Sequence, residues 1–183
     1  MLKRLIEWLM SLSSPRFKFY RRARLSYEAY LATIRTPFHL LSHEQHRQAG
    51  AAACLNRAEQ DYREAIRLTR EDRDIRNLTS VLYQLGMLLH LQGRFDDAEL
   101  QLRESLDLVT NMAQLEDDQQ ETASGCHYHL GVIAIMQGRL EDAKRELQAS
   151  IRIDTVLLDY NGLAIDREAL EHCDRLVGEK RNG

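Results

Sequence analysis

Proline and glycine are scarce in this sequence of 183 residues, which contains two prolines and nine glycines. Both residue types interrupt helices, and the long stretches between them are rich in Leu, Ala, Glu, Gln and Arg, which favour helix. No segment alternates apolar and polar residues in the manner of a half-buried strand. Hydrophobic residues make up 44% of the chain, enough for a core, which argues against intrinsic disorder. We therefore predict an all-α fold.

Cysteine is also rare, and Cys54, Cys126 and Cys173 are odd in number and far apart in the chain. This pattern argues against a disulfide framework and indicates a reducing compartment, so we expect a cytoplasmic protein. No apolar run approaches the roughly 20 residues that span a bilayer. A signal peptide is not expected, because Glu7 interrupts a short apolar stretch that has no evident cleavage site.

Charge is unevenly distributed along the chain. Residues 1–35 carry eight basic and two acidic side chains, a charge of +6, whereas the whole chain has a net charge of -3, which leaves -9 for the remainder. The first segment is therefore electrostatically distinct. We predict a basic helical region over residues 1–35 and a helical repeat domain over residues 36–183.

The repeat domain contains two copies of one pattern, because residues 79–110 align without gaps on residues 124–155. The positions shared by the two copies are Tyr83, Leu85, Gly86, Gln92, Gly93, Arg94, Asp97, Ala98, Leu102, Ser105 and Thr110 in the first, and Tyr128, Leu130, Gly131, Gln137, Gly138, Arg139, Asp142, Ala143, Leu147, Ser150 and Thr155 in the second. Each copy predicts two helices joined at a glycine, Gly93 or Gly138, in the left-handed conformation that closes a helix. Acidic residues then follow in the first turn of the second helix. Small residues in both helices would allow a close approach.

These units resemble tetratricopeptide repeats, whose signature has Leu-Gly in the first helix and a small residue after a tight turn. Leu85-Gly86 and Leu130-Gly131 match the first feature, and Ala98 and Ala143 match the second. The resemblance implies an array of antiparallel helical hairpins, an α-solenoid, that binds other proteins.

The units are farther apart than in the standard repeat, because the offset from Gly93 to Gly138 is 45 residues and the usual unit has about 34. The difference of about 11 residues is close to three helical turns and would preserve the inward-facing side, so residues 111–123 are predicted to lengthen the helices. A degenerate repeat is predicted over residues 36–70. Asn161-Gly162 is expected to end the long helix, followed by a capping helix over residues 163–178.

The resemblance also implies a partner-binding groove lined by the first helix of each unit. The groove positions fall on Tyr83, Met87, His90, Tyr128, Val132 and Ile135. This apolar set suits an apolar or amphipathic segment of a protein partner. Two alternatives remain open: the N-terminal helices of the chain cover these side chains, or a homodimer does.

No catalytic motif is present, and we predict that the protein is not an enzyme and has no cofactor. Cys126-His127-x-His129 is not expected to bind a metal, because residues two apart on a helix point in different directions. His39, His43 and His46 share one helical face but lack the acidic or cysteine ligands that would complete a zinc site, so we interpret them as a polar face.

The N-terminal region supports a competing function. Leu2, Leu5, Ile6, Leu9 and Leu12 form an apolar stripe with Trp8 beside it. Basic amphipathic helices of this kind lie in membrane interfaces. The residues predicted to contact an anionic membrane are Lys3, Arg4, Trp8, Arg16, Lys18, Arg21, Arg22 and Arg24. Packing on the repeat array is the structural alternative, and nucleic acid is the least favoured partner because no known binding module accompanies the basic stretch.

Overall fold

The computed structural model describes residues 18–26 and 52–182, and it is helical throughout these ranges apart from short connections. The chain divides into two compact units, residues Met1–Arg94 and Phe95–Gly183, which are described in turn. The all-α prediction is confirmed. The first helix of the degenerate repeat, predicted to begin at Thr36-Pro37, lies mostly outside the described residues, as do most of the basic N-terminal region and the three-histidine face.

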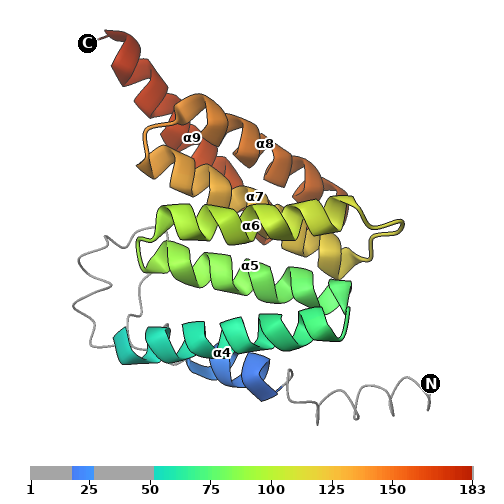
Figure 1. The fold of residues 1–183 in the computed structure, drawn as a ribbon. Helices are drawn as coiled ribbons and strands as arrows, with labels where there is room; N and C mark the ends of the chain where they lie inside the picture. The colour runs from blue at the N-terminus through green and yellow to red at the C-terminus, as the bar shows by residue number, and fades with distance from the viewer. Residues whose placement is uncertain (1–17, 27–51, 183) are drawn as a thin grey trace. The chain divides into compact units, whose positions relative to one another are not determined.

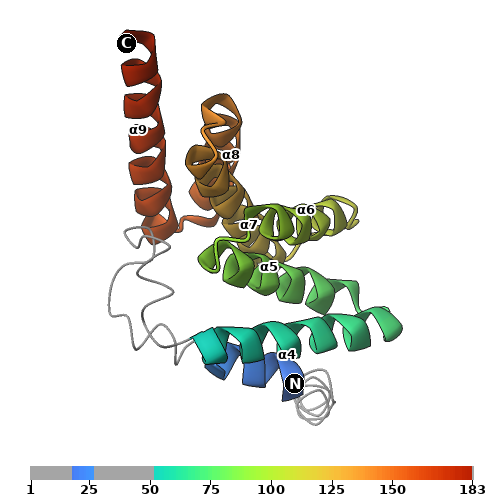
Figure 2. The same ribbon diagram turned by 60° about the vertical axis from the view of Figure 1, so that its left-hand side comes forward.

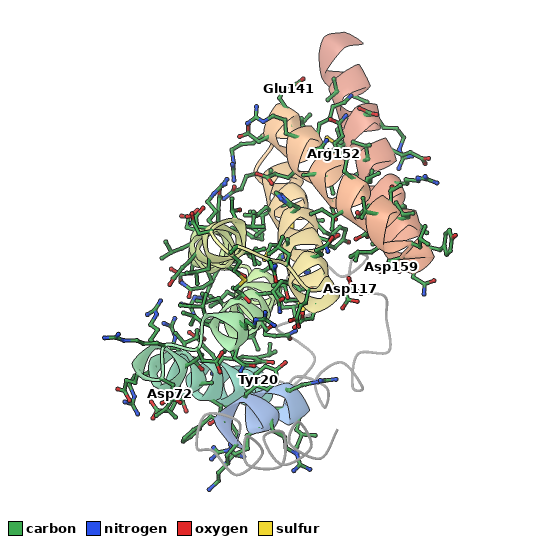
Figure 3. The ribbon with its side chains drawn as sticks, turned by 90° about the vertical axis from the view of Figure 1, so that its right-hand side faces the viewer. Tyr20, Asp72, Asp117, Glu141, Arg152 and Asp159 are labelled. Carbon is green, nitrogen blue, oxygen red and sulfur yellow. The ribbon has the colours of Figure 1, made fainter. Side chains whose placement is uncertain are left out.

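In the first unit, α4 (Ala52–Glu71) and α5 (Ile75–Leu91) form an antiparallel pair. The helix over residues 18–26 lies against α4 on the side opposite α5 (Figures 1 and 2). Its Ala23 is fully buried, and its Tyr20 ring stands 6.1 Å from the ring of Tyr62 in α4. Figure 3 labels Tyr20 on this helix. Arg22 forms an ion pair with Asp61 at 3.0 Å. Part of the basic region therefore packs on α4.

The apolar pattern of α4 follows the second helix of a repeat. Ala58, Tyr62 and Ala65 are fully buried, and Ile66 is 5% exposed. These residues have the spacing of three and four that places side chains on one helical face. The α4 helix thus has one buried apolar face.

In the second unit, α6 (Phe95–Thr110), α7 (Asp117–Met136), α8 (Leu140–Leu157) and α9 (Tyr160–Asn182) follow one another. Each helix packs on the next: α7 contacts both α6 and α8, and α9 lies mainly against α8 (Figure 1). A buried apolar cluster joins α7, α8 and α9 and consists of Ala134, Leu140, Ala143, Leu147 and Cys173.

Glycine closes α5 and α7 as predicted. Gly93 has φ = 73° and Gly138 has φ = 74°, a region that side chains disfavour. The following arginines donate their backbone N–H groups to carbonyls five residues earlier, Arg94 to Leu89 at 3.0 Å and Arg139 to Ala134 at 2.8 Å. This is the bond pattern of a Schellman motif, and it fixes the same sharp turn in both places.

The predicted extension over residues 111–123 is only partly helical. The α6 helix ends at Thr110, a connection follows, and α7 begins at Asp117. The side chain of Gln119 accepts a hydrogen bond from the backbone N–H of Glu116 at 3.1 Å, which completes a capping box and starts the helix there. The additional residues therefore divide between a connection and two extra turns at the start of α7.

The predicted end of the long helix at Asn161-Gly162 is wrong. The α8 helix ends at Leu157, and Leu158 takes the left-handed conformation with φ = 57°. Asp159 then accepts hydrogen bonds from the backbone N–H groups of Asn161 and Gly162, both at 3.1 Å. An aspartate side chain in this role begins a helix, so these two residues belong to the first turn of α9. The capping helix is also longer than predicted and runs to Asn182.

Candidate functional site

The predicted partner-binding residues lie on the first helices of the two repeats. Tyr83, Met87 and His90 lie on α5 in the first unit. Tyr83 and Met87 are partly exposed, but His90 is only 4% exposed. Of the three predicted α5 positions, Tyr83 and Met87 therefore reach solvent, while His90 belongs to the interior.

The α7 positions belong to the second unit, where Tyr128, Val132 and Ile135 are all partly exposed. They alternate with fully or nearly fully buried neighbours such as Leu130 and Ile133. Tyr128 and Ile135 also pack on the edge of the buried apolar cluster. The α7 helix thus has one face in the core and an apolar edge that reaches solvent. We call the three residues of this edge, Tyr128, Val132 and Ile135, the α7 margin.

The surroundings of Tyr128 are acidic. Burial, followed by the nearby carboxyl groups of Asp166 and Glu168 of α9, raises the pKa of its phenol to about 12. The phenol is therefore protonated at any physiological pH and can donate a hydrogen bond. Its ring stands 5.1 Å from the ring of His129 in an edge-on arrangement. Tyr128 is the residue through which the α7 margin meets α9.

The histidines beside Tyr128 have different environments. The His127 Nδ1 atom lies 2.7 Å from a Glu146 carboxylate oxygen of α8, and this hydrogen bond lowers the pKa of Glu146. His129 is 4% exposed, and burial lowers its pKa to about 4, which keeps the ring neutral. The two rings therefore do not converge on one ion. Among the described residues, no group of His, Cys, Asp and Glu has the arrangement of a metal site.

The described thiols have the properties of core residues. Cys126 and Cys173 are both fully buried and unpaired. Burial raises the pKa of Cys126 to about 12 and also raises the pKa of Cys173. A thiol that stays protonated is a poor nucleophile, so neither residue has the properties of a catalytic cysteine.

Repeated ion pairs tie each turn arginine to the preceding second helix. Arg94 contacts Glu59 of α4 at 2.8 Å in the first unit, and Arg139 contacts Glu99 of α6 at 2.7 Å in the second. Glu59 and Glu99 each follow the small buried alanine of their helix. These pairs were not predicted from the sequence. The available signal was a Gly-Arg pair at the end of α5 and of α7, together with an Ala-Glu pair in the helix before each, α4 and α6.

Helices that pack on their neighbours within each unit, glycine turns after α5 and α7, and repeated arginine–glutamate ion pairs are typical of an α-helical hairpin-repeat protein. The family model described as tetratricopeptide repeat matches residues 79–104 and 124–149. The two matched segments are therefore tetratricopeptide repeats, and Leu85-Gly86, Leu130-Gly131, Ala98 and Ala143 all fall inside them. Such repeats generally mediate protein–protein interaction and are typically non-catalytic. A search of curated proteins found no match.

None of the described helices is long and apolar enough to cross a membrane. Of the predicted membrane contacts, Lys3, Arg4, Trp8 and Arg16 lie outside the described residues. Lys18, Arg21, Arg22 and Arg24 lie on the helix over residues 18–26, and all four are exposed.

Proposed function

We propose that this protein is a non-catalytic adaptor or scaffold that binds a segment of a partner protein through the α7 margin, with Tyr83 and Met87 of α5 as further contacts. The observation that carries the proposal is the partial exposure of Tyr128, Val132 and Ile135 on the first helix of a tetratricopeptide repeat. Apolar side chains at such positions suit an apolar or amphipathic segment.

The mechanism of this adaptor is preorganisation. Tyr128 and Ile135 are held in place by the buried cluster beneath them, so they lose little side-chain freedom when a partner binds. The ordering cost then falls mainly on the partner segment. An extended or helical peptide would pack its apolar residues on this margin and leave its polar residues in solvent.

We expect the Tyr83→Ala/Tyr128→Ala variant to recover at least about tenfold less partner than the wild type in a crosslinked pull-down from the native cell, because two aromatic contacts typically contribute more than 1 kcal/mol each. Recovered proteins are identified by mass spectrometry. The matched control is Tyr160→Ala, which removes a tyrosine that is 74% exposed at the start of α9.

Tyr128 also packs on the core, so circular dichroism must show that the double variant keeps its helix content. Val132→Lys provides a second test, since it makes the margin polar without removing a residue of the buried cluster. Recovery of the same partners in equal amounts with all of these variants would refute the proposed binding surface.

A second candidate function is attachment to an anionic membrane through the basic N-terminal region. The observation that favours it is the exposed face formed by Lys18, Arg21 and Leu25, the last of these 54% exposed. Arg22 is already paired with Asp61. A basic surface with an apolar side chain suits a membrane containing anionic lipids.

For this second function, we expect Lys18→Glu/Arg21→Glu to lower binding to phosphatidylserine-containing vesicles by about tenfold or more, since each basic residue near the surface contributes about 1 kcal/mol. Deletion of residues 1–14 should also release the protein. The charge-matched control is Arg152→Glu/Arg175→Glu, which alters two exposed arginines of the second unit. Equal vesicle binding by wild type, deletion and both reversals would exclude a role for the N-terminal region.

A further inference from the structure

Two buried carboxyl groups meet where α7, α8 and α9 come together in the second unit. Asp154 of α8 is 5% exposed and Asp166 of α9 is 2% exposed. The Ser124 hydroxyl of α7 donates a hydrogen bond to Asp154, and the Ser150 hydroxyl of α8 donates one to the Ser124 carbonyl oxygen at 3.0 Å and lies beside Asp166. The two hydroxyl oxygens are themselves 2.9 Å apart. Polar side chains from three helices thus lie together in one buried group.

The acid at position 154 is particular to the second repeat. In the alignment of the two repeats, Asp154 falls on Val109, which is 3% exposed. A position that is apolar in one repeat therefore carries a carboxyl group in the other. Burying a carboxylate is costly unless it is paired or protonated. The substitution calls for a compensating interaction at this junction.

A third carboxyl group closes the cluster. A Cβ atom on Gly162 would lie 2.0 Å from Asp154 Oδ2 and 2.8 Å from Asp159 Oδ2. Both oxygens therefore point at the same small space beside the first turn of α9. Figure 3 shows Asp159 at the junction between α8 and α9. We call Asp154, Asp159 and Asp166 the acid cluster.

The acid cluster has no basic partner among the residues that the structure describes. Asp166 faces Asp154 from α8, Asp159 from the connection and Tyr128 from α7, and none of these groups carries a positive charge. The Oδ2 atom of Asp166 is buried and accepts no hydrogen bond. Burial, followed by the nearby Asp154 and Asp159, raises the pKa of Asp166 to about 6. Burial and Asp159 also raise the pKa of Asp154.

We propose that the acid cluster is a proton-dependent latch, which holds α9 against α7 and α8 when Asp166 is protonated and loosens it when Asp166 ionises. A protonated Asp166 supplies an O–H donor and removes one negative charge from beside Asp154 and Asp159. Ionisation leaves the buried carboxylates of Asp154 and Asp166 facing each other, with the exposed Asp159 beside them. The latch therefore favours the docked helix at lower pH.

The sign of the pH dependence follows from linkage. Asp166 has a pKa of about 6 when α9 is docked and an ordinary value, about 3.9, when it is exposed to water. The docked state consequently binds more protons between these two values. Its stability relative to the open state falls as pH rises from about 4 to about 6 and levels off above this range. This is opposite to the trend for an aspartate that is stabilised by a basic partner.

The latch has a consequence that rests on the proposed function. Tyr128 meets α9 at Asp166 and Glu168, so the docked helix limits access to the tyrosine at the α7 margin. Loosening of α9 would enlarge the apolar surface offered to a partner. Partner binding would then be favoured above the pH at which Asp166 ionises, and a bound partner would in turn hold α9 open.

Cys173 provides a direct test, because it lies on α9, is fully buried, and its thiol contacts the Leu140 carbonyl at 3.4 Å. Its labelling by a disulfide reagent is measured in the full-length protein at peptide level by mass spectrometry, at pH 5 and pH 7.5. Rates are corrected with a free cysteine peptide. We expect the corrected rate to be about tenfold higher at pH 7.5, which is the linkage expected for a shift of this size.

Asp166→Asn should abolish this difference between the two pH values, because the amide does not titrate. The control Glu171→Gln removes one exposed charge from α9 outside the acid cluster and should retain the difference. Corrected rates that are equal at the two pH values, or an Asp166→Asn variant that still responds, would overturn the latch. So would strong protection by millimolar Mg²⁺ or Ca²⁺ at pH 7.5, since the acid cluster would then be a cation site.

This measurement contains no partner protein, so its outcome is independent of the proposed adaptor function. Loss of the pull-down effect with an intact thiol response would remove the adaptor and leave the latch. A pull-down effect without a pH response of the Cys173 thiol would support the adaptor function and remove its regulation by the latch.

Discussion

Replacing Gly131 with alanine is expected to destabilise the second repeat by about 1–3 kcal/mol, the cost of overpacking a core contact. A Cβ atom at this position would lie 2.7 Å from Leu147 Cγ and 2.9 Å from its Cδ2. Leu147 is fully buried between helices and cannot simply swing into solvent. The free energy of unfolding, measured by urea denaturation at fixed pH, tests this expectation.

The control for this substitution is Gly178→Ala on α9, where an added Cβ would meet nothing within 4 Å. Both changes improve intrinsic helix propensity, by up to about 1 kcal/mol. Gly178→Ala should therefore be neutral or stabilising. If Gly131→Ala stabilised the protein to the same extent, α7 and α8 would not approach each other as closely at Gly131 and Leu147 as these distances indicate.

A second large effect is expected at Gly162, where alanine should cost about 2–3 kcal/mol. Its methyl group would lie 2.0 Å from Asp154 Oδ2, so the carboxyl group must turn away and give up its bond from Ser124. Overpacking and the loss of a buried hydrogen bond both contribute to this cost. Urea denaturation again supplies the measurement.

The double variant Gly162→Ala/Asp154→Ala separates this cause from a general intolerance of α9 to substitution. Removing the Asp154 side chain creates space for the methyl group, so the penalty of Gly162→Ala should fall below about 1 kcal/mol in that background. A penalty that is equal in both backgrounds would show that the contact with Asp154 is not its origin.

The sequence was a good guide where local chemistry decides the structure. Gly93 and Gly138 mark turns because few other residues adopt the positive φ values found there. The repeated pattern also predicted that the paired helices approach closely at Gly131, because small residues occur at the facing positions of both repeats. These features depend on one residue and its near neighbours, which a sequence comparison can detect.

Features that depend on contacts between distant residues were not predictable in this way. The end of α8 was placed at Asn161-Gly162 because Asn-Gly usually terminates a helix. Leu158 instead takes the left-handed conformation at a cost of about 1 kcal/mol, and Asp159 then begins the next helix. Nothing local in the sequence identifies a leucine for this role.

The acid cluster was missed for a similar reason. Asp154 and Asp166 lie on different helices, and each is unremarkable within its own stretch of sequence. The available signal was the alignment of the repeats, in which an acid stands opposite Val109 at a buried position. The candidate groove positions were located by the family resemblance, but the burial of His90 depends on packing that the pattern does not specify.

The ion pairs between successive helices also differ at the last junction of the array. Glu59 and Glu99 receive an arginine from the next turn, but the corresponding residue of the last repeat is Lys144, which contacts Asp174 of α9 at 2.7 Å. The charges at this final junction are reversed. A further repeat inserted after α8 would bring its turn arginine toward Lys144, and like charges at this distance repel. The reversal therefore disfavours a further repeat of this kind after α8, but only weakly, because the side chains of Lys144 and Asp174 are exposed.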